Sequence, residues 1–303
     1  MLIDELVKIC DNRYSTNICE CGNMFCSHPS GTCSGDCSRC LYEIHFPGRN
    51  GSVEKKTYDC PKMMDKYVCQ YLYSYASEIL TAFYYEYDFL RDMDNFRLLS
   101  IACGACPDLM ALEKLCIDNR LDKPIAFRGY DINKNWNLIH SYIKRYCDNV
   151  GIQRSFFSKD VLNCFHESTS ERANIITISY LISYLYNTNQ NDLIISFFED
   201  LTKNVIMKKA NGERVLVIIN DVNSNRRGRE YFDFLTRTLK RNEARIKSEF
   251  KYFDTGNLNF FQKVGSPYKS NECLFDIPIN LKTKHNIYDI HNRQTIQLLV
   301  EVY

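Results

Sequence analysis

The stretch "LLSIACGACPDLMALEKL", residues 98–115, contains an apolar run, a turn of small residues and the start of a helix. The run "LLSIA" has the length and composition of a buried strand, and Pro107 suits the first turn of a helix. Between them, Ala102, Gly104 and Ala105 are small enough for a ligand to approach the backbone. The stretch therefore predicts a strand, a tight turn and a helix, with the turn as a candidate binding loop.

Further strands and helices alternate after residue 95. The apolar runs "PIAFRGYD", "RSFFSKDV", "ANIITISYL" and "RVLVIIND" are separated by amphipathic segments. Such alternation is typical of βαβ units, in which helices cover both faces of a parallel sheet. We predict an α/β fold with a doubly wound, mostly parallel sheet of seven strands. Near the end of the chain, "NECLFDIPI" and "RQTIQLLVEVY" predict a terminal antiparallel hairpin at the sheet edge.

Carboxylates follow the second and third predicted strands. Asp131 ends "FRGYD", one helix and one strand after Gly104, and Asp160 follows "RSFFSK". Ligands of doubly wound sheets bind outside the carboxyl ends of the strands, where an acid can accept hydrogen bonds from ribose hydroxyls. The positions of these acids therefore favour a ligand that contains a ribose.

This order of elements resembles the class I S-adenosylmethionine-dependent methyltransferases. The resemblance implies that Gly104 meets the methionine part of the cofactor, that Asp131 binds its ribose and that Asp160 lies near the adenine amino group. It also implies that Ser179 and Tyr180, after the fourth strand, face the sulfonium and the substrate. Tyr180 is then either a candidate catalytic residue or an ordinary aromatic residue at a strand end, and no other catalytic residue is indicated. The cofactor-binding residues that it implies are Ala102, Gly104, Ala105, Asp131, Ile132, Asp160, Val161 and Ser179.

The turn departs from the pattern of that family at three positions. Ser100 stands where the family has an acid, and Ala102 and Cys106 stand where it has glycines. Alanine costs little there if its φ is negative, whereas the Cys106 side chain lies where backbone should meet the ligand. The alternative is a retained fold that binds no cofactor.

Composition and charge restrict the class of protein. The 303 residues are 45% hydrophobic and 13% aromatic, which is enough for a sizeable core. Because 38 Lys and Arg nearly balance 37 Asp and Glu, no overall field attracts nucleic acid or an anionic membrane. The acidic start "MLIDELVKIC" and the lack of a long apolar run predict a soluble, cytoplasmic protein.

Nine of the 15 cysteines precede residue 70. In a cytoplasmic protein, closely spaced cysteines indicate metal binding rather than disulfides. Tetrahedral zinc needs four thiolate or imidazole ligands, and short loops bring such pairs to one ion at little entropic cost. We predict a zinc-stabilised module, with Cys69 as a further candidate and with ligands from Cys19, Cys21, Cys26, His28, Cys33, Cys37, Cys40, His45 and Cys60.

The same segment allows a second interpretation. "CSGDCSRC", residues 33–40, matches the Cys-x3-Cys-x2-Cys spacing with which radical S-adenosylmethionine enzymes hold an iron–sulfur cluster. That family places the motif at the beginning of a β/α barrel. Here a long helix and a doubly wound pattern follow, so zinc is the favoured prediction.

Residues 61–94 predict an amphipathic helix that connects the module to the α/β part. The apolar side chains four residues apart on its face are Tyr67, Tyr71, Tyr75, Ile79, Phe83 and Tyr87. Such a stripe packs against a core or stacks nucleobases, and we predict packing. The predicted domains are a Cys-rich module (1–60), the connecting helix (61–94) and a methyltransferase-like domain (95–303).

A polar segment follows the fifth predicted strand. "INDVNSNRRGREYF" begins with Asn220 and Asp221 and contains Arg226 and Arg227. Loops at strand ends often carry binding residues, and these arginines suit an acidic or phosphate-bearing substrate. A solvated turn with a helix cap is the other interpretation.

Two functions fit this sequence. The first is a methyltransferase that uses S-adenosylmethionine on a nucleic acid, a protein or a small molecule, since the residues do not select the acceptor. No general base stands out, because His166 is the only histidine near a predicted strand end. The second is a catalytically inactive binding or regulatory protein, whose zinc module recognises a nucleic acid or a protein partner.

Overall fold

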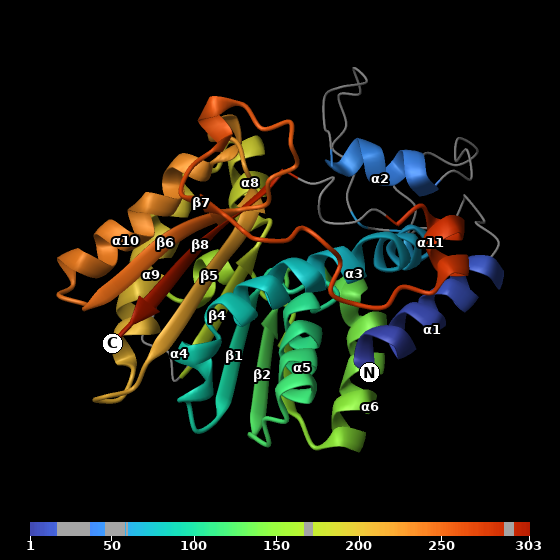
Figure 1. Ribbon diagram of the computed structural model, residues 1–303, viewed down its shortest axis with the longest axis horizontal. Helices are drawn as coiled ribbons and strands as arrows, with labels where there is room; N and C mark the ends of the chain where they lie inside the picture. Colours follow the sequence, from blue (N-terminus) through green and yellow to red (C-terminus); the bar gives the residue numbers. More distant parts are fainter. Residues whose placement is uncertain (17–36, 46–57, 59, 167–171, 288–293) are drawn as a thin grey trace.

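The computed structural model describes residues 1–16, 37–45, 58, 60–166, 172–287 and 294–303. At its centre is an eight-stranded sheet in the order β3-β2-β1-β4-β5-β8-β6-β7 (Figure 1). Neighbouring strands are parallel, except that β8 runs antiparallel to β5 and β6. The mostly parallel α/β fold predicted from the sequence is confirmed. The strands are β1 (Phe96–Ile101), β2 (Ile125–Tyr130), β3 (Gln153–Phe157), β4 (Ile175–Ser179), β5 (Val215–Val222), β6 (Ile246–Tyr252), β7 (Ser266–Pro267) and β8 (Thr295–Val302).

Helices cover both faces of the sheet. Successive side chains of a strand point to opposite faces, so Leu98 joins one buried cluster and Leu99 the other. The first cluster includes residues of α1 (Leu2–Thr16), α3 (Pro61–Tyr85), α4 (Tyr87–Arg91), α5 (Pro107–Asn119), α6 (Asn137–Val150) and α11 (Ile279–His285). The second includes residues of α7 (Val161–Cys164), α8 (Leu181–Asn187), α9 (Asn191–Asn204) and α10 (Phe232–Arg241). The remaining helix, α2 (Cys37–His45), packs against α3.

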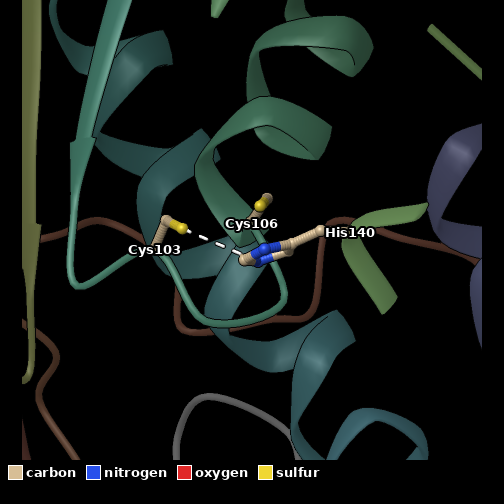
Figure 2. A group of neighbouring side chains, drawn as sticks. All are labelled: Cys103, Cys106 and His140. Atoms are coloured by element: carbon tan, nitrogen blue, oxygen red, sulfur yellow. Dashed lines mark hydrogen bonds between the residues drawn. The ribbon is translucent and has the colours of Figure 1, made fainter. Parts of the chain in front are cut away.

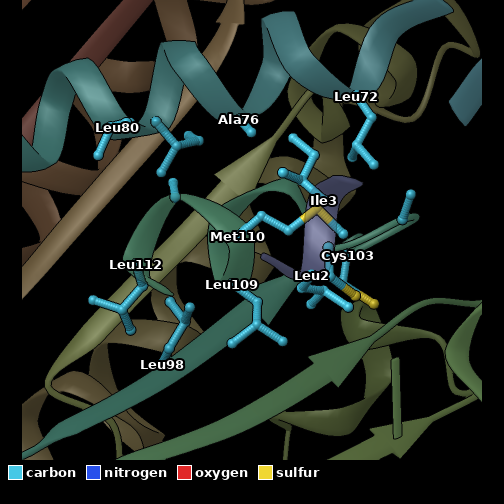
Figure 3. Close-up of a cluster of buried hydrophobic side chains, with 14 of the residues drawn as sticks. Leu2, Ile3, Leu72, Ala76, Leu80, Leu98, Cys103, Leu109, Met110 and Leu112 are labelled. Carbon is cyan, nitrogen blue, oxygen red and sulfur yellow. The ribbon is translucent and has the colours of Figure 1, made fainter. Parts of the chain in front are cut away.

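The N-terminal helix belongs to the main core. Leu2 and Ile3 of α1 belong to the same buried cluster as Leu72 of α3 and Met110 of α5, which Figure 3 shows. The backbone N–H of Leu2 also donates a hydrogen bond to Glu113 Oε2, at 3.0 Å. Part of the predicted 1–60 module therefore packs with the α/β core, while the division into three domains stays a prediction.

The predicted connecting helix consists of α3 and the short α4. The C-terminal half of α3 packs as the stripe predicts, because Ile79 and Phe83 are fully buried. The N-terminal half differs, since Tyr67, Tyr71 and Tyr75 are only half-buried. A four-residue spacing drifts around a helix of 3.6 residues per turn, so this end of the stripe leaves the apolar core.

The C-terminal strands are antiparallel, as predicted, but one of the two segments predicted to form the hairpin is not a strand. Residues 271–278 of "NECLFDIPI" form no strand, and α11 begins at Ile279. The apolar residues here pack on α3 instead: Phe275 lies 6.2 Å from Tyr73, ring centre to ring centre, and the Leu274 N–H donates to Ser77 Oγ. Strand β8 therefore pairs with β5 and β6 and lies between them. The eighth strand is β7, which has only two residues and is therefore too short to give a strand pattern in the sequence.

Among the described residues, none of the helices combines the length and the apolar character needed to span a bilayer.

Candidate functional site

The turn between β1 and α5 has an unusual backbone. Ala102, Gly104 and Cys106 have φ values of 57°, 47° and 59°, in the left-handed region that suits glycine. These are the three positions at which the class I methyltransferases, the family that the sequence resembles, have glycines. Alanine at 102 therefore does not have the negative φ that would make it inexpensive, and each non-glycine residue costs about 1 kcal/mol here. The turn keeps a conformation suited to glycine although two glycines are replaced.

Asp131 connects this turn to β2. Its Oδ2 accepts a hydrogen bond from the Gly104 N–H and its Oδ1 one from the Asn133 N–H, both at 2.9 Å. Burial raises the pKa of the Asp131 carboxyl, and these two N–H groups lower it. Each carboxylate oxygen has two acceptor sites, so the group can accept further bonds from two hydroxyls. The predicted loop glycine and the predicted ribose acid are thus in direct contact.

The predicted adenine side lies at the ends of β2 and β3. Ile132 is 67% exposed, which is a large exposed fraction for an isoleucine beside a half-buried carboxylate. Asp160 is the N-cap residue of α7, where its carboxylate accepts bonds from the Leu162 N–H (3.0 Å) and the Asn163 amide (2.9 Å). Val161 is buried behind it. Ala105 is buried in the turn, and Ser179 ends β4 on the other side of β1.

A buried carboxylate near the turn was missed by sequence reasoning. Asp108, the second residue of α5, is 2% exposed and accepts a hydrogen bond from the Thr177 hydroxyl. Burial raises the pKa of Asp108, and hydrogen bonds from Ser100 and Thr177 lower it. Ser100 is the position at which the resembling family has an acid. Asp108 thus places a buried carboxylate next to the position where that family has an acid. The sequence does not indicate this, because an acidic residue is common in the first turn of a helix.

Tyr180 points toward α3. Its φ is 56°, and its hydroxyl donates to Glu78 Oε2 at 2.8 Å. Its ring centre lies 4.7 Å from that of Tyr75. Glu78 is fully buried, and its Oε2 also accepts a bond from the Asn220 amide at 2.9 Å. The candidate catalytic hydroxyl is therefore held by a buried network, and its catalytic role stays a prediction.

The polar segment after β5 begins later than predicted. Asn220 and Asp221 belong to β5 and are buried. Asp221 Oδ2 accepts a hydrogen bond from the Ser183 N–H at 3.0 Å, so it fixes the start of α8. Arg226 is exposed and Arg227 half-buried in the following turn. His166, the histidine near a predicted strand end, contacts the Asp200 carboxylate through Nδ1.

A row of aromatic rings runs from Trp136, after β2, along α3 to Tyr180, after β4. Neighbouring ring centres lie 4.7 to 6.2 Å apart. A Cβ atom added to Gly104 would lie 3.6 Å from the Trp136 ring, so this row reaches the turn. The four-residue spacing of the tyrosines in the sequence indicated an aromatic face on this helix, but it predicted only that the face packs against the core. The row consists of Trp136, Tyr58, Tyr67, Tyr71, Tyr75 and Tyr180.

Most predicted zinc ligands lie outside the described residues, namely Cys19, Cys21, Cys26, His28 and Cys33. Cys37 and Cys40 are buried one turn apart on α2, and Cys60 precedes α3. His45 Nε2 lies 3.0 Å from the Tyr58 hydroxyl. Cys69 is buried near Asp11 and His285. The zinc module therefore stays a prediction.

The sequence matches no protein-family model and no curated protein. Among solved structures, the plantazolicin methyltransferase BpumL in complex with SAH is 13% identical, covers 98% of each chain and has a TM-score of 0.44. Magnesium protoporphyrin IX methyltransferase from Synechocystis PCC 6803 is 9% identical, with a TM-score of 0.42 over 88% of this chain and 97% of that one. A SAM-dependent methyltransferase from Archaeoglobus fulgidus is 13% identical, with a TM-score of 0.39 over 75% and 94%. At these identities and TM-scores, the activity has to be judged from the chain's own residues.

Proposed function

We propose that the chain binds S-adenosylmethionine outside the carboxyl ends of β1 and β2 and transfers its methyl group to an acceptor. The observation that carries this proposal is the β1–α5 turn. Its backbone stays left-handed at positions 102, 104 and 106 despite the cost of two side chains. Strained backbone persists where the surrounding structure enforces it, and it is concentrated at ligand sites.

The residues present fit such a cofactor. Asp131 has acceptor capacity left for two ribose hydroxyls while it holds the Gly104 N–H. The exposed side chain of Ile132 offers an apolar surface to a flat base, which would remove it from water. Asp160 follows the adjacent strand, at the same edge of the sheet. When bound, the cofactor supplies the electrophilic methyl group, so the protein contributes mainly position and alignment.

The acceptor and the role of zinc are further proposals. The half-buried tyrosines of the aromatic row offer ring faces near the turn, and Arg226 offers a positive charge beyond β5. Both suit a planar or anionic acceptor. A zinc module would position such an acceptor or stabilise the chain beside α3.

The test is a calorimetric titration with S-adenosylmethionine and S-adenosylhomocysteine (SAH). Wild type is expected to bind both, and Ile132→Asp to bind at least about tenfold more weakly because a carboxylate replaces the apolar contact. Ile117→Asp is the matched control, since Ile117 is 54% exposed on α5, and it should bind like wild type.

Two results would count against the proposal. If wild type binds neither compound, the chain is a binding or regulatory protein that keeps only the fold. If Ile132→Asp binds like wild type, the cofactor lies elsewhere. Thermal unfolding of both variants shows whether the fold is intact, because neither side chain is buried.

A further inference from the structure

Two thiols and an imidazole converge beneath the β1–α5 turn. Cys103 and Cys106 come from the turn and His140 from α6, and all three are buried. The two Sγ atoms and a ring nitrogen of His140 lie within 4.8 Å of one another. Figure 2 shows the side chains around one point, with Cys103 Sγ 3.8 Å from His140 Nε2.

We propose that Cys103, Cys106 and His140 bind one zinc ion, at a site separate from the Cys-rich module. Zinc takes Cys sulfur at about 2.3 Å and His nitrogen at about 2.0 Å in a tetrahedron, which sets these atoms about 3.5 Å apart. The observed Cys103 to His140 distance is close to this value. Three protein ligands leave the fourth corner to a water molecule or to the Gly104 carbonyl oxygen, which is 2.7 Å from His140 Nε2.

The chemistry of the donors selects a soft or borderline cation. Thiolate and imidazole suit zinc, whereas magnesium and calcium require oxygen ligands. Binding releases the two thiol protons, and the ring proton, which Nε2 now donates to the Gly104 carbonyl, moves to Nδ1. Two thiolates then cancel the two charges of the ion, so the buried centre is neutral and its desolvation cost is small.

Burial acts in opposite directions on the pKa values of the imidazole and of the two thiols. Burial lowers the pKa of His140 to about 4, so the ring is neutral near pH 7 and able to bind a metal. Burial also raises the pKa of both thiols. A cation reverses that effect, because it stabilises the thiolate.

The site also accounts for Cys106. A residue with a φ of 59° is strained unless it is glycine, yet this position holds a cysteine whose side chain is fully buried. A bound ion would stabilise this conformation, since Cys106 would then be fixed to Cys103 and to α6. The other grouping of this kind in the described residues, Asp11, Cys69 and His285, is a poorer cation site because Lys284 Nζ lies 2.6 Å from Asp11.

The test measures zinc per chain in the full-length protein by elemental analysis. Cys106→Gly and His140→Gln should each contain one zinc ion fewer than wild type, whatever the Cys-rich module binds. Glycine adopts the left-handed φ without strain, so Cys106→Gly is expected to fold, and circular dichroism checks this. Cys147→Ala is the matched control, because Cys147 is also buried and lies on α6; it should keep the wild-type zinc content.

A second measurement does not depend on a variant. In cadmium-substituted wild type, ¹¹³Cd NMR should show one resonance from a centre with two sulfur ligands, and Cys106→Gly should lack it. Unchanged zinc in Cys106→Gly, or a Cys103 to Cys106 disulfide in the purified protein, would overturn the proposal. SAH binding is measured separately, so failure of the zinc site and failure of the proposed function are distinguishable.

Discussion

The two halves of the carboxyl edge of the sheet differ in what covers them. Beside β1 and β2, Asp131 is half-buried and Ile132 is 67% exposed. Beside β4 and β5, Glu78 of α3 fills the edge and binds Tyr180 and Asn220. The proposed function would place the cofactor on the first half and the methyl acceptor near the second. The difference is between a half whose polar and apolar side chains stay accessible and a half closed by the protein's own side chains.

The largest effect is expected from removal of Glu78. Glu78→Ala leaves the Tyr180 hydroxyl and the Asn220 amide without their shared acceptor in a buried region. We expect a loss of about 3–5 kcal/mol in the free energy of unfolding, measured with urea. Glu5→Ala, at an exposed position of α1, should change it by less than about 0.5 kcal/mol. A loss below about 1 kcal/mol for Glu78→Ala would show that the network does not close this half.

Tyr180→Phe separates a structural role from a binding role. It removes the hydroxyl that hydrogen-bonds to Glu78 and to Thr295, and it keeps the ring against Tyr75. The free energy of unfolding should fall by about 1–2 kcal/mol, while the SAH affinity stays within about twofold. Tyr184→Phe, at a 58% exposed position of α8, should change neither quantity. A tenfold weaker SAH affinity in Tyr180→Phe would mean that the two halves form one site.

Asp221 gives the closed half a pH dependence. Burial raises its pKa to about 6, so the folded state holds the proton more tightly than the unfolded chain does. Protonation of Asp221 therefore stabilises the folded state. This contribution to the free energy of unfolding is fully present at low pH and is lost as the pH rises through about 6. Between pH 5 and pH 7, wild type should therefore lose about 1 kcal/mol more stability than Asp221→Asn. Asp233→Asn, at an exposed position of α10, should keep the wild-type loss, and parallel curves for wild type and Asp221→Asn would contradict this assignment.

The sequence predicted the open half better than the closed half. Gly104 and Asp131 follow strands that are clear as apolar runs, and parallel strands bring their carboxyl ends to one edge, so their contact follows from the fold. Glu78 could not be predicted, because a carboxylate inside an amphipathic helix normally reads as a solvent-facing residue. Its burial depends on β5 and β8, which are distant in sequence.

The turn itself shows the same limit. Its position was predictable from the strand and from Pro107, but the positive φ of Ala102 and Cys106 was not, since most residues avoid that region. The convergence of His140 on the two turn cysteines was missed for a related reason. Cysteine spacing indicates a metal site only in the first 70 residues, whereas this histidine comes from α6, which follows β2 in the sequence.

The central claim is that the β1 and β2 half still holds a cofactor, and a crystal structure of the chain grown with SAH tests it most directly. We expect the ribose hydroxyls within hydrogen-bond distance of the Asp131 carboxylate and the adenine against Ile132. SAH bound at another edge of the sheet, or no SAH in crystals grown at a saturating concentration, would contradict the account.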